Sequence, residues 1–194
     1  AFAEAVHNCV GDDDCLDVMS SVDHLIATGL ADPEELGICG WSQGGFMTAW
    51  AVGHTTRFGA AVMGAGVSDW GMMVATSDIP SYESHMGGGN PYEGIGPHGF
   101  DRQSPISFVS NATTPTLILH GENDERVPLN QAEFFYRGLR TYGVPTELVA
   151  YPREPHGVRE RRHQIDLMQR TADWFQRWLP IKEQDEDADG SSAS

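Results

Sequence analysis

The sequence predicts an α/β protein, with a mostly parallel sheet covered by helices on both faces. Two observations support this fold class. Short apolar runs alternate along the chain with longer stretches of helical periodicity. The short runs are apolar throughout, rather than at every second residue, which is typical of strands buried on both faces. A third observation, the chain length of 194 residues with 40% hydrophobic content, indicates one globular domain with a sizeable core.

The elements follow in order from these patterns. Apolar residues at helical spacing over 14–28 predict a first helix, which Gly29 ends. The apolar run 36–39 predicts a short strand, and a helix is expected directly after it at 44–52. The same reasoning predicts strands at 60–63, 116–120 and 147–151, and helices from about 129 to 142 and from about 162 to 179.

Two segments stand outside this pattern. Residues 70–111 are rich in Gly and Pro and include GGGNPYEGIGPHG, so we expect a long irregular stretch. Such a stretch serves as a lid or pocket wall, or else it is disordered. The tail 183–194, EQDEDADGSSAS, combines acidic and small residues. Such a composition cannot bury enough apolar surface to fold, and it predicts disorder.

Composition excludes some classes of function. The net charge is −16, from 28 acidic and 12 basic residues, whereas a nucleic-acid surface needs Lys and Arg to bind phosphate. No apolar run approaches the ~20 residues that span a bilayer, so no membrane insertion is expected.

The cysteines bear on the compartment. Three of them (Cys9, Cys15 and Cys39) make no disulfide framework, and the lack of C-x-x-C argues against structural zinc. They favour a reducing compartment, and we expect a cytoplasmic protein. Cys39 lies in an apolar run and is expected to be buried.

The most informative stretch is Gly40-Trp41-Ser42-Gln43-Gly44, which matches G-x-S-x-G between a predicted strand and a predicted helix. In a nucleophile elbow a serine occupies such a sharp, strained turn, which small neighbours permit. Ser42 at a helix N-terminus would also have unpaired backbone N–H groups nearby, able to stabilise negative charge. A plain strand-turn-helix corner is the alternative.

A serine nucleophile needs a base, and eight histidines compete for this role. His156 is the best candidate because it lies in a loop between the last strand and the last helix, REPHGVRERRH. That loop is expected at the carboxyl ends of the strands, on the same rim as Ser42. The other histidines are expected in helices, at a strand end, in the N-terminal segment or in the long Gly-rich segment: His7, His24, His54, His85, His98, His120 and His163.

The third member should be an acid that orients the imidazole. Asp124 follows the strand 116–120 in TLILHGENDERVP and so lies at the same rim. Glu122 is a close alternative, and Asp69 is a more distant one. The order Ser42, Asp124, His156 is the order of the α/β-hydrolase fold, and it differs from those of trypsin and subtilisin.

With these residues placed, the chain resembles the catalytic domain of the prolyl oligopeptidase family of serine peptidases, nearest to its acylaminoacyl-peptidase branch. The resemblance covers about 8–180. It is carried by GLADPEELGICGWSQGGFMTAW, TSDIP, QSPISFV, TPTLILHGENDERVP, PHGV and DWFQRWL. It implies that Ser42 attacks a peptide carbonyl, that His156 moves the proton and that Asp124 orients His156.

The resemblance also implies binding roles. The backbone N–H of Gln43 would form half of an oxyanion hole, Arg126 would bind a substrate backbone carbonyl, and Trp70 would line the pocket for the residue before the scissile bond. A surface ion pair is the alternative for Arg126, and core packing is the alternative for Trp70. Short peptides are the implied substrate, with no metal and no cofactor, and a homo-oligomer is left open.

The chain departs from the family in two ways. Many relatives have Gly where Trp41 stands. The N-terminal β-propeller and the first strands of the hydrolase sheet have no counterpart, including a tyrosine that supplies the second oxyanion donor in relatives. We therefore expect 1–182 to be a partial α/β-hydrolase domain from the C-terminal portion of a longer enzyme, with an unpaired edge at 36–39 and impaired activity alone.

Two other functions compete with peptide hydrolysis. An esterase acting on small esters could use the same three residues. A non-catalytic interaction module is the alternative from another class. A metal hydrolase is disfavoured because the sequence contains no H-E-x-x-H or comparable cluster.

Overall fold

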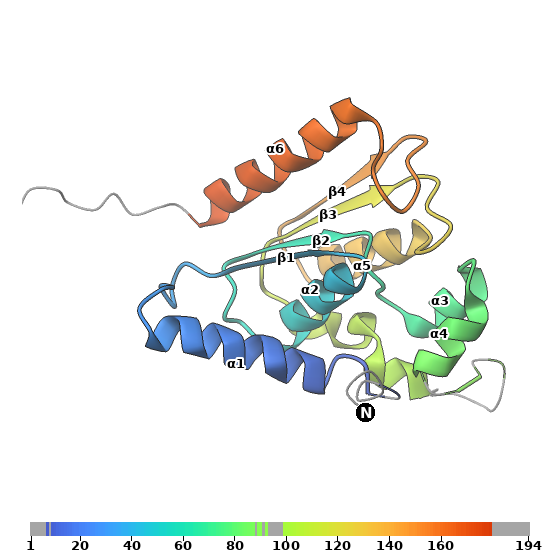
Figure 1. The fold of residues 1–194 in the computed structure, drawn as a ribbon, viewed down its shortest axis with the longest axis horizontal. Helices are drawn as coiled ribbons and strands as arrows, with labels where there is room; N and C mark the ends of the chain where they lie inside the picture. The colour runs from blue at the N-terminus through green and yellow to red at the C-terminus, as the bar shows by residue number, and fades with distance from the viewer. Residues whose placement is uncertain (1–6, 8, 88, 91, 93–98, 180–194) are drawn as a thin grey trace, which may run out of the picture.

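The computed structural model describes residues 7, 9–87, 89–90, 92 and 99–179. Its centre is a parallel four-stranded sheet in the order β1-β2-β3-β4. The strands are β1 (Gly37–Trp41), β2 (Ala60–Gly64), β3 (Thr116–Gly121) and β4 (Thr146–Tyr151). Because all pairs are parallel, the carboxyl ends of the four strands lie on the same side of the sheet (Figure 1). The predicted α/β class and parallel sheet are confirmed.

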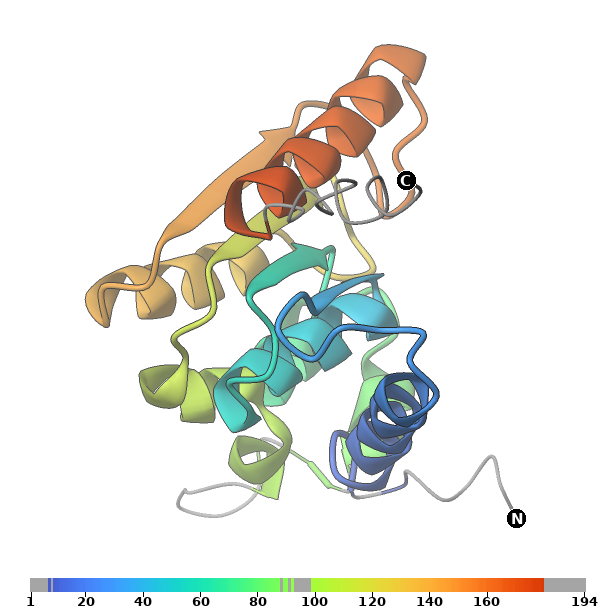
Figure 2. The ribbon, with the colours of Figure 1, turned by 90° about the vertical axis from the view of Figure 1, so that its left-hand side faces the viewer.

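Helices cover both faces of the sheet (Figures 1 and 2). On one face lie α2 (Gln43–His54) and α5 (Asn130–Thr141), whose apolar residues form a core with Ala61, Met63 and Ile118. On the other face α6 (Arg161–Trp178) packs Trp174 and its neighbours against Val62 and Leu119. The successive residues of β2 and β3 thus face different cores, which explains why these strands are apolar throughout.

The N-terminal helix α1 (Asp13–Ala27) lies beside α2 rather than on the sheet (Figure 2). Its buried Cys15 contributes to a further apolar cluster with Phe46 and Trp50 of α2. Gly29 follows α1 with φ +72°, a conformation that glycine adopts without strain, and so ends the helix where the sequence predicts.

The prediction of a long irregular stretch over 70–111 is wrong for most of its length. The chain there forms α3 (Trp70–Thr76), α4 (Pro80–Gly87), and two 3₁₀ segments, η2 (Gly99–Gln103) and η3 (Pro105–Asn111). These elements are too short to show a clear apolar period. They are stabilised instead by caps, such as the Asp69 carboxylate that accepts a hydrogen bond from the N–H of Met72 (2.8 Å).

The edges of the sheet differ from its centre. Among the described residues β1 has a strand on one side only, as the sequence predicts. Cys39 on this edge is exposed, so its predicted burial is wrong. No helix in the described part of the chain is long and apolar enough to cross a membrane. The predicted disordered tail, 183–194, lies outside the described residues.

Candidate active site

Ser42 lies on a strained turn between β1 and α2. Its φ of 60° and ψ of −117° are rare for a residue with a side chain. The turn is tight, since a Cβ on Gly40 would lie only 2.3 Å from the carbonyl oxygen of Gly44. Two hydrogen bonds hold the turn, from Ser42 N–H to the Gly64 carbonyl oxygen and from Phe46 N–H to the Ser42 carbonyl oxygen, both 2.9 Å.

The structure brings Ser42, His156 and Asp124 together. Nε2 of His156 is 2.8 Å from Oγ of Ser42, and Nδ1 of His156 is 2.8 Å from Oδ2 of Asp124. The three side chains come from the loops after β1, β4 and β3, so the parallel sheet places them at one rim. Each distance is within hydrogen-bond reach, and the arrangement suits proton transfer from Ser42 to His156.

Asp124 is buried and held on both carboxylate oxygens. Oδ1 accepts hydrogen bonds from the backbone N–H groups of Arg126 (3.0 Å) and Val127 (2.9 Å), which leaves Oδ2 for His156. His120 lies behind it, with Nε2 3.5 Å from Oδ2, but donates to the Val127 carbonyl oxygen at 2.7 Å. Burial lowers the pKa of His120, which keeps this ring neutral.

Neither alternative acid, Asp69 or Glu122, is hydrogen-bonded to His156 in the described part of the chain. Asp69 caps α3, as described above, and no hydrogen bond joins Glu122 to His156 among the described residues. The alternative histidines also have other partners. His54 lies 2.8 Å from the Trp50 carbonyl oxygen, His163 pairs with Glu154, and His7 packs against His85. His24 lies in the last turn of α1, and His98 is outside the described residues.

A pocket of about 200 Å³ opens beside Ser42 and His156. Gln43 and Trp70, both predicted site residues, line it. Because Gln43 is the first residue of α2, its N–H has no acceptor within that helix. Trp70 is almost fully buried and packs against Phe46, so it belongs to both the pocket wall and the core.

Arg126 also lines the pocket, and its guanidinium holds Asp78 through two hydrogen bonds, Nε to Oδ1 at 2.7 Å and Nη2 to Oδ2 at 3.3 Å. This pairing lowers the pKa of the Asp78 carboxyl. Both side chains are partly exposed, so the ion pair itself stabilises the fold little. It does fix the guanidinium at the mouth of the pocket.

Sequence reasoning missed the pocket residues from α3, α4 and the residue between these helices, because it predicted no helices there. Most are apolar, and one is the carboxylate of Glu83. They are Met73, Ile79, Tyr82, Glu83 and Met86. Only tertiary packing reveals them: α3 contributes Trp70 and Met73 to the cluster with Phe46 of α2, and α4 packs against α3.

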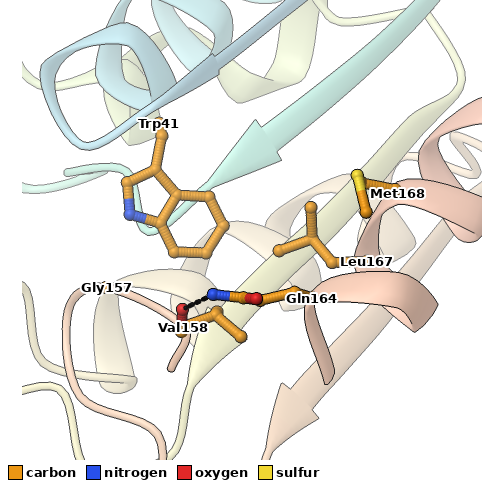
Figure 3. A pocket seen from close by; sticks show the side chains of 6 residues that line it. All are labelled: Trp41, Gly157, Val158, Gln164, Leu167 and Met168. Carbon is orange, nitrogen blue, oxygen red and sulfur yellow. Dashed lines mark hydrogen bonds between the residues drawn. The ribbon is translucent and has the colours of Figure 1, made fainter. Parts of the chain in front are cut away.

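Trp41 lies on the far side of the His156 loop. Its Nε1–H donates a 2.8 Å hydrogen bond to the His156 carbonyl oxygen, and its ring packs against Gly64. Beyond the ring is a second, mainly apolar hollow of about 440 Å³, bounded by Val158 and by Leu167 and Met168 of α6 (Figure 3). A tryptophan at this position thus supports the loop that carries His156.

Known peptidases resemble this chain in sequence. The chain is 37% identical over 182 residues to the uncharacterized peptidase YuxL of Bacillus subtilis, covering 92% of this chain and 28% of YuxL. It is 32% identical to the acylamino-acid-releasing enzyme of Arabidopsis thaliana, covering 89% of this chain and 23% of that enzyme. The chain thus spans less than a third of the length of these relatives.

A solved structure resembles this chain in fold. The acylaminoacyl peptidase of Pyrococcus horikoshii superposes with a TM-score of 0.87 at 30% identity, over 96% of this chain and 31% of that protein. The predicted α/β-hydrolase fold is confirmed by this similarity. The family model described as the prolyl oligopeptidase family matches residues 1–182. The chain belongs to the prolyl oligopeptidase family.

Proposed function

We propose that this chain carries the catalytic centre of a serine peptidase that hydrolyses short peptides, with N-acylated peptides as the first substrates to test. The single observation that supports this most strongly is the continuous hydrogen-bonded row Ser42–His156–Asp124, with both links at 2.8 Å. A neighbouring acylaminoacyl peptidase of 30% identity was solved with Z-Gly-Gly-Phe-chloromethyl ketone, a peptide compound.

The chemistry follows from the positions of these groups. Oγ of Ser42 attacks the peptide carbonyl carbon while Nε2 of His156 takes its proton. The carbonyl oxygen becomes an oxyanion, which the Gln43 N–H at the start of α2 is placed to stabilise. His156 then gives the proton to the leaving amine as the C–N bond breaks. Water, activated by the same imidazole, releases the acyl group from Ser42.

Asp124 and Arg126 have supporting roles in this proposal. The carboxylate of Asp124 accepts from Nδ1 of His156 and offsets the charge of the imidazolium. Arg126, fixed by Asp78, is placed to donate to a backbone carbonyl of the bound peptide. Trp70 forms part of the wall against which the side chain before the scissile bond packs.

The test uses the full-length protein, a fluorophosphonate probe and two kinds of substrate. We expect the probe to label wild type and Ser20→Ala, whose serine is exposed on α1, but not Ser42→Ala. N-acetyl-peptide anilides should be cleaved by the proteins that the probe labels. Turnover of p-nitrophenyl esters without amide cleavage would instead support an esterase, and labelling that survives in Ser42→Ala would overturn the proposal.

A further inference from the structure

Glu83 places a buried carboxylate in the wall of the pocket beside Ser42. The residue is only 4% exposed and comes from α4. Its carboxylate accepts no hydrogen bond from the described residues, although its oxygens are not completely sealed from solvent. A carboxylate in such a largely buried side chain loses much of the hydration that stabilises its charge. Such a group in a pocket wall therefore points to a partner that arrives with the ligand.

The rest of the pocket wall has an apolar part and a polar part. The apolar part is formed by Val67, Trp70, Met73, Ile79, Met86 and Val127, and the polar part by Ser42, Gln43, Tyr82, Arg126 and His156. The volume of about 200 Å³ is below the ~300–1,000 Å³ of pockets for drug-sized ligands and suits one amino-acid side chain. The indole Nε1 of Trp70 is likewise buried without a partner among the described residues. The apolar part of the wall suits a side chain with an apolar stem, and the buried polar groups beside it suit a polar group at the end of that stem.

Among the described residues, no basic side chain forms an ion pair with the Glu83 carboxylate. Arg126 lies nearby, but its guanidinium is already paired with Asp78. The other titratable groups of the pocket are Tyr82 on the same helix and His156 from the loop after β4. Burial raises the pKa of Glu83 to about 7, with Arg126 lowering and Asp78 raising it. The carboxylate therefore changes charge near neutral pH.

We propose that Glu83 is a specificity-determining residue, and that this pocket takes a substrate side chain with an apolar stem and a hydrogen-bond donor at its end. The side chain belongs to the residue whose carbonyl Ser42 attacks, so the inference rests on the proposed function. The donor is an ammonium, as in lysine, or a hydroxyl, as in tyrosine. The methylenes or the ring lie against the apolar wall, and the donor pairs with Glu83.

The pocket would discriminate between substrates because a side chain without a donor leaves the Glu83 carboxylate unpaired. A purely apolar side chain of the same size would fill the pocket and still leave the Glu83 carboxylate without a donor. A site built to hydrogen-bond a substrate group rejects analogues that lack this group far more strongly than an apolar pocket rejects a missing methylene. The ionised carboxylate also attracts an ammonium, so the preference for lysine should grow as Glu83 loses its proton.

The experiment compares matched peptide anilides on the full-length protein from pH 6 to 8.5. Lysine is paired with norleucine, and tyrosine with phenylalanine, because each pair differs only in the terminal donor. We expect kcat/KM for lysine to exceed that for norleucine by at least about tenfold at pH 8. This ratio should fall toward pH 6, as Glu83 is protonated with a pKa of about 7. The tyrosine-to-phenylalanine ratio should change less with pH.

The variants separate Glu83 from the rest of the site. Glu83→Gln keeps the shape and removes the charge, so the lysine-to-norleucine ratio at pH 8 should fall about tenfold. The partly exposed carboxylate of Glu133 on α5, which pairs with Arg137 away from the pocket lining, provides the control, Glu133→Gln, which should behave as wild type. A ratio near one in wild type, or a preference that persists in Glu83→Gln, would overturn the inference.

A second measurement distinguishes a failure of the Glu83 inference from a failure of the peptidase proposal. Peptidyl chloromethyl ketones with lysine or norleucine alkylate the active site, and their relative rates of labelling report on the pocket without any peptide cleavage. If no peptide is hydrolysed but the lysine reagent labels faster in wild type than in Glu83→Gln, the inference holds and the peptidase proposal fails. Equal labelling rates for the two reagents, with Ser42 reactive to fluorophosphonate in every variant, would reject the role of Glu83.

Discussion

Nδ1 of His163 lies 2.7 Å from Oε1 of Glu154, and this contact joins the loop that carries His156 to the first turn of α6. The same carboxylate accepts hydrogen bonds from the backbone N–H groups of Arg159 (2.6 Å) and Glu160 (2.9 Å). The carbonyl oxygen of Glu154 accepts from Asn123 N–H (2.9 Å), next to Asp124. One buried residue thus ties together the two loops that hold the proposed base and acid.

We predict that Glu154→Gln lowers kcat roughly 10- to 100-fold with little change in KM, the scale expected when a catalytic group is displaced by about 1 Å. An amide has one acceptor oxygen, so it cannot serve all three N–H groups. Steady-state kinetics on peptide anilides would measure kcat and KM separately. The exposed Glu147, paired with Arg177, provides the control variant Glu147→Gln. Unchanged kcat in Glu154→Gln would show that the loop needs no such anchor.

The same residue predicts a pH dependence of stability. Burial acts to raise the pKa of Glu154, but the hydrogen bonds from Arg159, His163 and Glu160 outweigh it, and the pKa is lowered below its usual 4.5. The stabilisation is therefore complete above about pH 4.5 and is lost as the pH falls through the lower, folded value. Urea denaturation should show wild type losing its advantage over Glu154→Gln as the pH falls below 4.5. An advantage that grows on acidification would contradict this.

Asp124→Asn should lower kcat by about 10⁴-fold, the loss seen when a triad acid is replaced by its amide. Oδ1 already accepts two backbone N–H groups, so the amide oxygen of the substituted side chain would remain there and its NH₂ would face Nδ1 of His156. The ring would then take the tautomer with a proton on Nε2, which cannot accept from Ser42. The measurement is single-turnover acylation by a p-nitrophenyl ester, with circular dichroism to establish folding. Near-normal acylation would contradict the assigned role.

Trp41→Phe tests the hydrogen bond from the indole to the His156 carbonyl oxygen. The ring of Phe would still pack against Gly64, but the donor would be lost. A neutral hydrogen bond contributes ~0.5–1.5 kcal/mol, so we expect kcat to fall by a few-fold up to about tenfold. Stopped-flow acylation measures the effect. Trp41→Gly, which removes the packing as well, should be affected more. Equal rates in wild type and Trp41→Phe would contradict a supporting role for the indole.

The sequence predicts the parts of this structure whose signal is local. The strands β2 and β3 are apolar at every position because both faces are buried, and a short scan of the chain detects such runs. Ser42, Asp124 and His156 follow strands, and parallel topology brings strand ends together. Because each residue follows a strand of a parallel sheet, the order of strands and helices along the chain is enough to predict that the three side chains lie near one another.

The missed parts depend on tertiary contacts. α3 and α4 have seven and eight residues, too few for a period to stand out among Gly and Pro. The burial of Glu83 results from the packing of α4 beside the pocket, which no local pattern encodes. The apolar run around Cys39 predicts burial, but β1 is an edge strand among the described strands and leaves Cys39 exposed.

The last prediction concerns Gly44 and Gly45, which follow Ser42. The sequence motif includes Gly44, whereas the structure leaves no room for a side chain at Gly45. Gly44 belongs to G-x-S-x-G, yet a Cβ there would meet nothing within 4 Å. Gly45 lies outside the motif, yet its Cβ would be 2.2 Å from the carbonyl oxygen of Gly64 and 2.8 Å from Cα of Gly66. Both atoms are backbone, so α2 would have to move away from β2.

We therefore expect Gly45→Ala to be destabilised by about 1–3 kcal/mol or more, the scale of overpacking in a core. Gly44→Ala should keep its stability, since alanine is the better helix former. Urea denaturation of the two variants, followed by tryptophan fluorescence, makes the comparison, and fluorophosphonate labelling reports whether Ser42 is still placed to react. If Gly44→Ala were the more damaged of the two, the close approach of α2 to the Gly64–Gly66 backbone would not be the constraint that shapes this turn.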